Sequence, residues 1–145
     1  MKFIPKKRTY MHAVDIQALA IKIALMRPES HVSQPFGPQC DVVKVFDKMF
    51  LLTGEVQQQK FINLKINPDQ MDELKALYPS IKAGYHMNKK HWISIFEGPK
   101  IDAALIEDLV TASYQLVVDK LNKTQKMRLQ LLASIRCNAQ KLHEE

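Results

Sequence analysis

The segment from Asp102 to Leu121 limits the possible folds more than any other stretch of this 145-residue chain. Its apolar residues fall at helical spacing on two adjacent rows: Leu105, Leu109, Ala112 and Leu116 on the first, and Ile106, Val110 and Val117 on the second. A helix with two neighbouring apolar rows is covered over a wide arc of its surface. The sequence therefore predicts a long helix that packs deeply against another layer, and the segments before it favour a β-sheet as that layer.

The segments predicted to be strands lie in the middle of the chain. Runs rich in β-branched and aromatic residues occupy five ranges, 41–46, 49–53, 60–66, 81–87 and 91–97. Asp47-Lys48 is expected to join the first two strands, 54–59 to form a turn, and 88–90 to form the tip of a second hairpin. Because hairpins pair strands antiparallel, we expect an α+β domain with an antiparallel sheet of about five strands and helices packed on one face.

Further helices are predicted at 14–27, after Asn67, and at 123–142. The helix after Asn67 has that residue as its N-cap and Pro68 at its first position. Its buried stripe is expected to consist of Met71, Leu74 and Leu77. The stretch 29–39 contains two prolines and a glycine and is expected to be a loop.

The net charge of +6 is concentrated at the two ends of the chain. Residues 1–12 carry a net charge of +4, residues 120–145 carry +4, and the middle carries −2. We therefore divide the chain into a basic leader (1–11), an α+β domain (12–121) and a basic amphipathic C-terminal helix (122–145). A polyanion would meet the two ends first, and a central binding site would depend on a local cluster of cations.

The composition also bears on location. No apolar run approaches the roughly 18 to 20 residues that span a bilayer, and no export signal follows the basic start. We expect a cytoplasmic protein without a membrane partner. Cys40 and Cys137 lie far apart in no metal-binding pattern, so they are expected to be free thiols in a reducing compartment.

The motifs of common enzymes are missing. The chain has no GxSxG, HExxH, Walker loop or GxGxxG sequence. Ser113 and Tyr114 fall in the buried helical pattern and are expected to make structural hydrogen bonds. His86 and His91 could converge on a hairpin, but no carboxylate or thiol lies at ligand spacing around them. We therefore expect no catalytic residues, no metal and no cofactor, and a protein that binds a partner.

Three stretches occur in an order that resembles the MmcQ/YjbR family. They are Pro35-Phe36-Gly37-Pro38, then Ile62-Asn63-Leu64-Lys65 running into Asn67-Pro68, then Gly84-Tyr85-His86-Met87-Asn88-Lys89-Lys90-His91-Trp92. The similarity covers about residues 11–121. It implies a frataxin/CyaY-like α+β fold and, by analogy with "double-wing" β-hairpin modules, binding to DNA. The chain departs from the family pattern at Asp47, where glycine is usual, and at Ile93-Ser94, where a polar pair is usual.

Candidate contacts with DNA lie on the second predicted hairpin: His86, Asn88, Lys89, Lys90, His91 and Trp92. The two lysines would contact phosphates, the amide and imidazoles would add hydrogen bonds, and the indole would stack on a base or brace the turn. Alternatively, the aromatic side chains anchor the hairpin in the core and the lysines form a solvated turn. Basic residues elsewhere would extend a phosphate-directed contact: Lys48 at the first hairpin, Lys7 and Arg8 in the leader, and Lys126 in the last helix.

The C-terminal helix also has two interpretations. Its apolar face contains Leu129, Leu132, Ile135, Ala139 and Leu142. This face would pack on the domain or on a second copy of the chain, which would make the protein an interaction module or a homodimer. The same helix would otherwise offer its cations to a nucleic-acid backbone.

Overall fold

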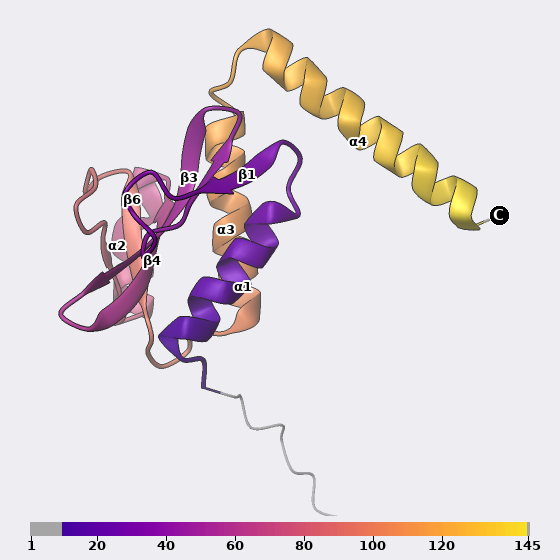
Figure 1. Cartoon of the computed structure of the whole chain (residues 1–145). Helices are drawn as coiled ribbons and strands as arrows, with labels where there is room; N and C mark the ends of the chain where they lie inside the picture. The colour runs from indigo at the N-terminus through magenta and orange to yellow at the C-terminus, as the bar shows by residue number, and fades with distance from the viewer. Residues whose placement is uncertain (1–9, 145) are drawn as a thin grey trace, which may run out of the picture.

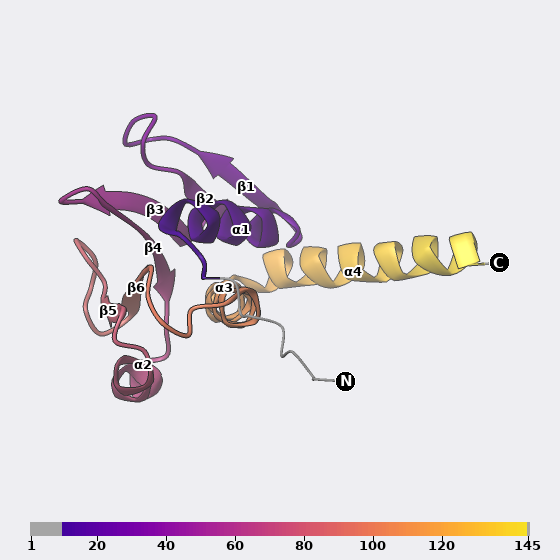
Figure 2. The same cartoon turned by 90° about the horizontal axis from the view of Figure 1, so that it is seen from below.

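The deeply packed helix is α3 (Ala103–Val118), and it lies with α1 (Ala13–Leu25) on one face of a β-sheet (Figures 1 and 2). The computed structural model describes residues 10–144 of the chain. The side chain of Asp102 caps α3, because its carboxylate accepts the backbone N–H of Leu105 at 2.9 Å. The predicted packing of this helix is confirmed.

The sheet contains six antiparallel strands. They are β1 (Ser30–Ser33), β2 (Val42–Val45), β3 (Lys48–Val56), β4 (Gln59–Lys65), β5 (Ile81–Ala83) and β6 (Trp92–Phe96). Their spatial order is β1-β2-β3-β4-β6-β5, with every neighbouring pair antiparallel. The predicted α+β fold, an antiparallel sheet with helices on one face and an additional C-terminal helix, is confirmed.

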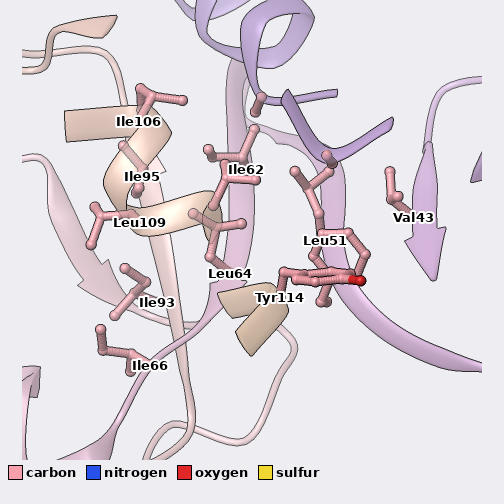
Figure 3. Packing of buried hydrophobic residues seen from close by; sticks show 14 of the residues in the cluster. Val43, Leu51, Ile62, Leu64, Ile66, Ile93, Ile95, Ile106, Leu109 and Tyr114 are labelled. Carbon is pink, nitrogen blue, oxygen red and sulfur yellow. The ribbon is translucent and has the colours of Figure 1, made fainter. Parts of the chain in front are cut away.

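The core lies between the sheet and the two helices (Figure 3). Cross-strand pairs on β3, β4 and β6 point toward the helices, with Leu51 opposite Leu64, Leu64 opposite Ile93, and Ile62 opposite Ile95. All five of these side chains are fully buried. Each buried aliphatic side chain contributes about 1.5–3 kcal/mol to folding, so this layer supplies much of the stability of the domain.

A side chain of α3 hydrogen-bonds the backbone at a β-bulge between β2 and β3. The register shifts at Val43/Lys44 and leaves Phe50 without a partner residue on β2. The hydroxyl of Ser113 donates to the carbonyl of Phe50 at 2.6 Å and accepts the N–H of Lys65 at 2.8 Å. One buried side chain thereby satisfies backbone groups on two strands and fixes α3 against them.

Two expectations about the strands were wrong. The stretch 29–39 was expected to be a loop, yet it contains β1, because a short polar segment can pair as the edge of a sheet. The turn expected at 54–59 is only Gln57-Gln58, both with positive φ (49° and 64°). Gly54 lies inside β3, where a Cβ would sit 2.6 Å from the ring of Phe61.

The hairpins also differ in detail from the sequence prediction. The first turn is Phe46-Asp47, and its left-handed residue is Phe46 (φ 53°) rather than Asp47. In the second hairpin, β5 and β6 are shorter than expected and are joined by an eight-residue loop, 84–91. The side chains of Asn88 and Lys89 in this loop hydrogen-bond the backbone of the loop itself.

The helix after Asn67 begins as predicted. The side chain of Asn67 accepts the N–H of Asp69 at 3.0 Å, and the first turn is a 3₁₀ turn, η1 (Pro68–Gln70), that leads into α2 (Met71–Leu77). Met71 is buried, but Leu77 is exposed, so the predicted stripe is wrong at its end. This short helix lies beside β5 at the edge of the sheet (Figure 2).

The last helix, α4 (Lys123–Glu144), projects away from the domain (Figure 1). Its base is attached through Leu129, which is buried in the core, and through Arg128, whose Nη2 lies 3.3 Å from Glu29 Oε1. Further along it, Leu132 is half-buried, whereas Leu131, Ile135 and Leu142 are exposed. The apolar face therefore divides, with its first part packed on the domain and the rest uncovered.

Within residues 10–144, no helix is both long enough and apolar enough to cross a membrane.

We predict that Ser113→Ala lowers the free energy of unfolding by about 1–3 kcal/mol, because two buried backbone groups would then have no hydrogen-bond partner. Urea denaturation measures the change. Ser134→Ala on the exposed part of α4 is the matched control and should shift stability by less than about 0.5 kcal/mol. Equal effects of the two substitutions would contradict this role of Ser113.

Candidate nucleic-acid interface

The loop 84–91 is attached to the helix-free face of the sheet by a hydrogen-bonded triangle. Asn63 on β4 and Ser94 on β6 lie opposite each other and alternate with the core-facing residues, so they point away from the helices. Asn63 donates to the carbonyl of Tyr85 at 3.1 Å, and Ser94 accepts the N–H of Tyr85 at 2.8 Å. The Ser94 hydroxyl donates to Asn63 at 2.5 Å, which closes the triangle.

Close packing at Gly84 and Trp92 supports the same loop. Gly84 donates its N–H to the carbonyl of Trp92 at 2.8 Å, and a Cβ on Gly84 would lie 2.6 Å from the Cβ of Trp92. The indole of Trp92 is buried, so it braces the loop in this structure. His86 occupies the left-handed region at φ 58°, which turns the chain back after Tyr85.

The polar residues of the loop have different roles. Lys89 Nζ donates to the carbonyl of Gly84 at 3.1 Å, and the Asn88 side chain accepts the N–H of Lys90 at 2.9 Å. These two side chains stabilise the loop itself. The side chains of Lys90 and His91 take no part in the two hydrogen bonds made by Lys89 and Asn88. Both side chains are exposed and therefore accessible from solvent.

A cluster of three lysines, Lys48, Lys65 and Lys120, lies beside the loop; we call it the lysine cluster. All three line one hollow together with Trp92, and Lys65 and Lys120 line the adjoining hollow with His91. Lys65 Nζ lies 5.7 Å from the centre of the Trp92 ring. Burial lowers the pKa of Lys65, and the like charges of Lys120 and Lys48 lower that pKa further.

The lysine cluster lacks a carboxylate partner within the described part of the chain. The ion pairs found between residues 10 and 144 are His12–Glu97 and Arg128–Glu29, with N···O distances of 3.6 and 3.3 Å. Asp119 precedes Lys120, but its carboxylate accepts a hydrogen bond from Gln115 at 2.8 Å. Like charges that lie together without counterions favour the binding of an anion.

An open apolar groove adjoins the lysine cluster on the same face of the sheet. It has a volume of about 850 Å³ and lies between the loop that carries Phe36 and the loop that carries Tyr85, with Leu52, Gly54 and Phe61 at its floor. Met49 and Met87 line both this groove and the hollow of the lysine cluster. The two features therefore form one continuous surface, which we call the open-face site.

The structure gathers only some of the residues predicted from the sequence. Lys48, His86, His91 and Trp92 belong to the open-face site, and Lys126 lies on α4. Lys7 and Arg8 fall outside the described residues. Among residues 10–144, no group of three His, Cys, Asp or Glu side chains is placed to hold a metal ion.

Sequence reasoning did not identify Lys65, Lys120 or Phe36 as site residues. The two lysines lie in different elements far from Lys48 in the sequence, and only the sheet order and the end of α3 bring them together. Phe36 belongs to the Pro35–Pro38 stretch that resembles the family. Nothing in the sequence singles it out, because only the structure shows that its ring is exposed.

The sequence of the chain matches the family model described as YjbR over residues 25–116. The chain belongs to the YjbR family. It is 44% identical to the protein YbdF of Escherichia coli O157:H7, over 82% of this chain and 98% of that protein. It is 30% identical to the protein YjbR of Escherichia coli strain K12, over 61% of this chain and 76% of that protein.

Solved structures support the same assignment. The protein DR2400 of Deinococcus radiodurans aligns with a TM-score of 0.69 and 31% identity, over 85% of this chain and 91% of that one. A protein of Pseudomonas syringae aligns with a TM-score of 0.57 and 26% identity, over 66% of this chain and 93% of that one. The YjbR match ends at residue 116, so α4 lies beyond it.

We predict that Lys120→Gln raises the pKa of Lys65 toward its ordinary value of 10.5, because one of the two like charges that lower it is removed. NMR titration of the lysine Cε–Hε signals measures this pKa. Lys22→Gln on the exposed surface of α1 is the control and should leave the pKa of Lys65 unchanged. An unchanged value in the Lys120 variant would mean that the two ammonium groups do not interact.

Proposed function

We propose that this protein binds DNA mainly through contacts with phosphates at the lysine cluster, with low sequence selectivity. The observation that carries the proposal is the convergence of Lys48, Lys65 and Lys120 without an ion-paired carboxylate in the described chain. Each lysine that neutralises a phosphate releases condensed counterions, and this release drives binding without reading the bases.

The surroundings of the lysine cluster support an anionic ligand. Burial and, after it, two like charges lower the pKa of Lys65, and a phosphate beside Lys65 would offset the repulsion and favour the protonated amine. Lys90 and His91 are exposed on the neighbouring loop and would extend the contact. Lys126, Lys7 and Arg8 would add further phosphate contacts from the basic ends of the chain.

We propose binding without catalysis. The hydroxyl groups of α3 that could have acted as nucleophiles have structural partners: Ser113 bonds Phe50 and Lys65, and Tyr114 donates to the carbonyl of Pro28 at 2.8 Å. Their positions in the core separate them from the open-face site.

We predict that the double substitution Lys48→Ala/Lys120→Ala weakens binding to a short random-sequence DNA duplex. The slope of log affinity against log salt concentration should become less steep by roughly 0.9 for each phosphate that the protein no longer neutralises. Fluorescence anisotropy of the labelled duplex, repeated at several salt concentrations, measures both quantities. Both side chains are exposed, so the substitutions leave the core intact.

The double substitution Lys22→Ala/Lys75→Ala is the matched control, because it removes the same charge from α1 and α2. It should change the salt slope less than the substitutions in the lysine cluster. Equal slopes for the two double variants would assign binding to net charge alone. No binding by the unaltered protein at low salt would refute the proposed function.

A second candidate function, self-association through α4, is favoured by the exposed apolar residues on its outer turns. Leu131, Ile135 and Leu142 follow the four- and seven-residue spacing of a coiled-coil seam, and all three are more than half exposed. A second copy of the chain offers the same seam. The cations of the two helices would repel each other, so this pairing should strengthen as salt screens them.

We predict that Leu131→Ser/Ile135→Ser reduces any dimer measured by light scattering at high salt, because it removes apolar area from the seam. These positions lie beyond Leu129, so the attachment of α4 to the core remains. A protein that stays monomeric at every salt concentration, with or without the substitutions, would exclude self-association. The opposite salt dependences of this pairing and of DNA binding separate the two functions.

A further inference from the structure

Contacts with phosphates alone would leave the apolar groove of the open-face site empty. Phe36 exposes 72% of its surface at one wall, and Tyr85 exposes 36% at the other. The ring of Tyr85 is held in place by edge-to-face contacts with Phe61 and His86, at centroid distances of 5.8 and 4.2 Å. Exposed aromatic side chains around a groove of this size are typical of a binding surface.

The groove contains hydrogen-bonding groups as well as apolar ones. Exposed glutamine side chains lie at its edge, at Gln39, Gln57 and Gln58. Each primary amide can both donate and accept a hydrogen bond, as the edge of a nucleobase does. A groove for an aliphatic chain alone would not require this polar edge.

The groove and the lysine cluster are continuous through Met49 and Met87. A ligand that extends across this boundary would place a planar or apolar part in the groove and an anionic part on the lysines. A nucleotide within a strand has this composition, because its base and its phosphate are separated only by the sugar. The surface thus resembles the combination of stacking side chains and cationic groove that holds single strands.

We propose that the groove accepts an unpaired nucleobase of single-stranded DNA, stacked on Phe36 or Tyr85, while the adjacent phosphates contact the lysine cluster. This inference rests on the proposed function, because the phosphate contacts are the same in both. It adds a preference for DNA in which bases are free to leave the stack. In a duplex the bases are paired and stacked, so only the phosphate contacts are available.

The first experiment compares two labelled single strands of equal length and charge, one with random bases and one in which all sites are abasic. We expect the strand with bases to bind at least about fivefold more tightly, with the same salt slope for both strands, because base–aromatic stacking adds affinity without adding phosphate contacts. Anisotropy measures both. Equal affinities would overturn the groove inference and leave the proposed function intact, whereas binding of neither strand at low salt would overturn both.

The second experiment uses Phe36→Ala, which removes an exposed ring and leaves the core unchanged. Affinity for the strand with bases should fall by about 5- to 150-fold, while affinity for the abasic strand should stay the same. Phe36→Tyr should retain the affinity of the unaltered protein, and Leu77→Ala on α2 is the control for removal of an exposed apolar side chain. If Phe36→Ala changed the oligomeric state by light scattering and left single-strand affinity unaltered, the groove would be an interface between copies, and the inference would be wrong.

Discussion

The hydrogen bonds among Asn63, Ser94 and the backbone of Tyr85 connect the two central strands to the loop that crosses them. In the described part of the chain, helices cover only one face of this sheet, so the buried polar side chains on the other face need partners from elsewhere. The loop 84–91 provides those partners through its backbone. In doing so it places Tyr85 and Met87 at the groove, and His91 beside the lysine cluster.

The two faces of the sheet therefore differ in the residues that they carry. The helix-covered face carries mostly aliphatic residues, together with Phe50, which packs edge-to-face on Tyr114 of α3, and it supplies most of the buried apolar area. The other face carries Phe61, Lys65 and the groove. Because Ser113 joins α3 to β3 and β4, and Lys120 follows directly after the end of α3, the packing of the core also fixes one wall of the open-face site.

The elements with strong periodicity were predictable from the sequence, whereas the site was predictable only in part. The two apolar rows of α3 and the cap at Asn67 depend on neighbouring residues, so their patterns are local. β1 has no such pattern, because an edge strand of four residues is defined by its partner. The lysine cluster depends on strand order, and the role of Lys89 depends on a hydrogen bond within its own loop. Both features depend on tertiary structure, which the spacing of residues in the sequence does not reveal.

The edges of the sheet have a consequence for behaviour at high concentration. An antiparallel sheet can grow by accepting another strand along a free edge, which is a common start of aggregation. Here the edge strands are β1 and β5, of four and three residues, and α2 lies beside β5. Edges this short offer few free backbone groups to an incoming chain. The protein can therefore leave much of one face of its sheet without a helix and still offer a poor template for fibrils.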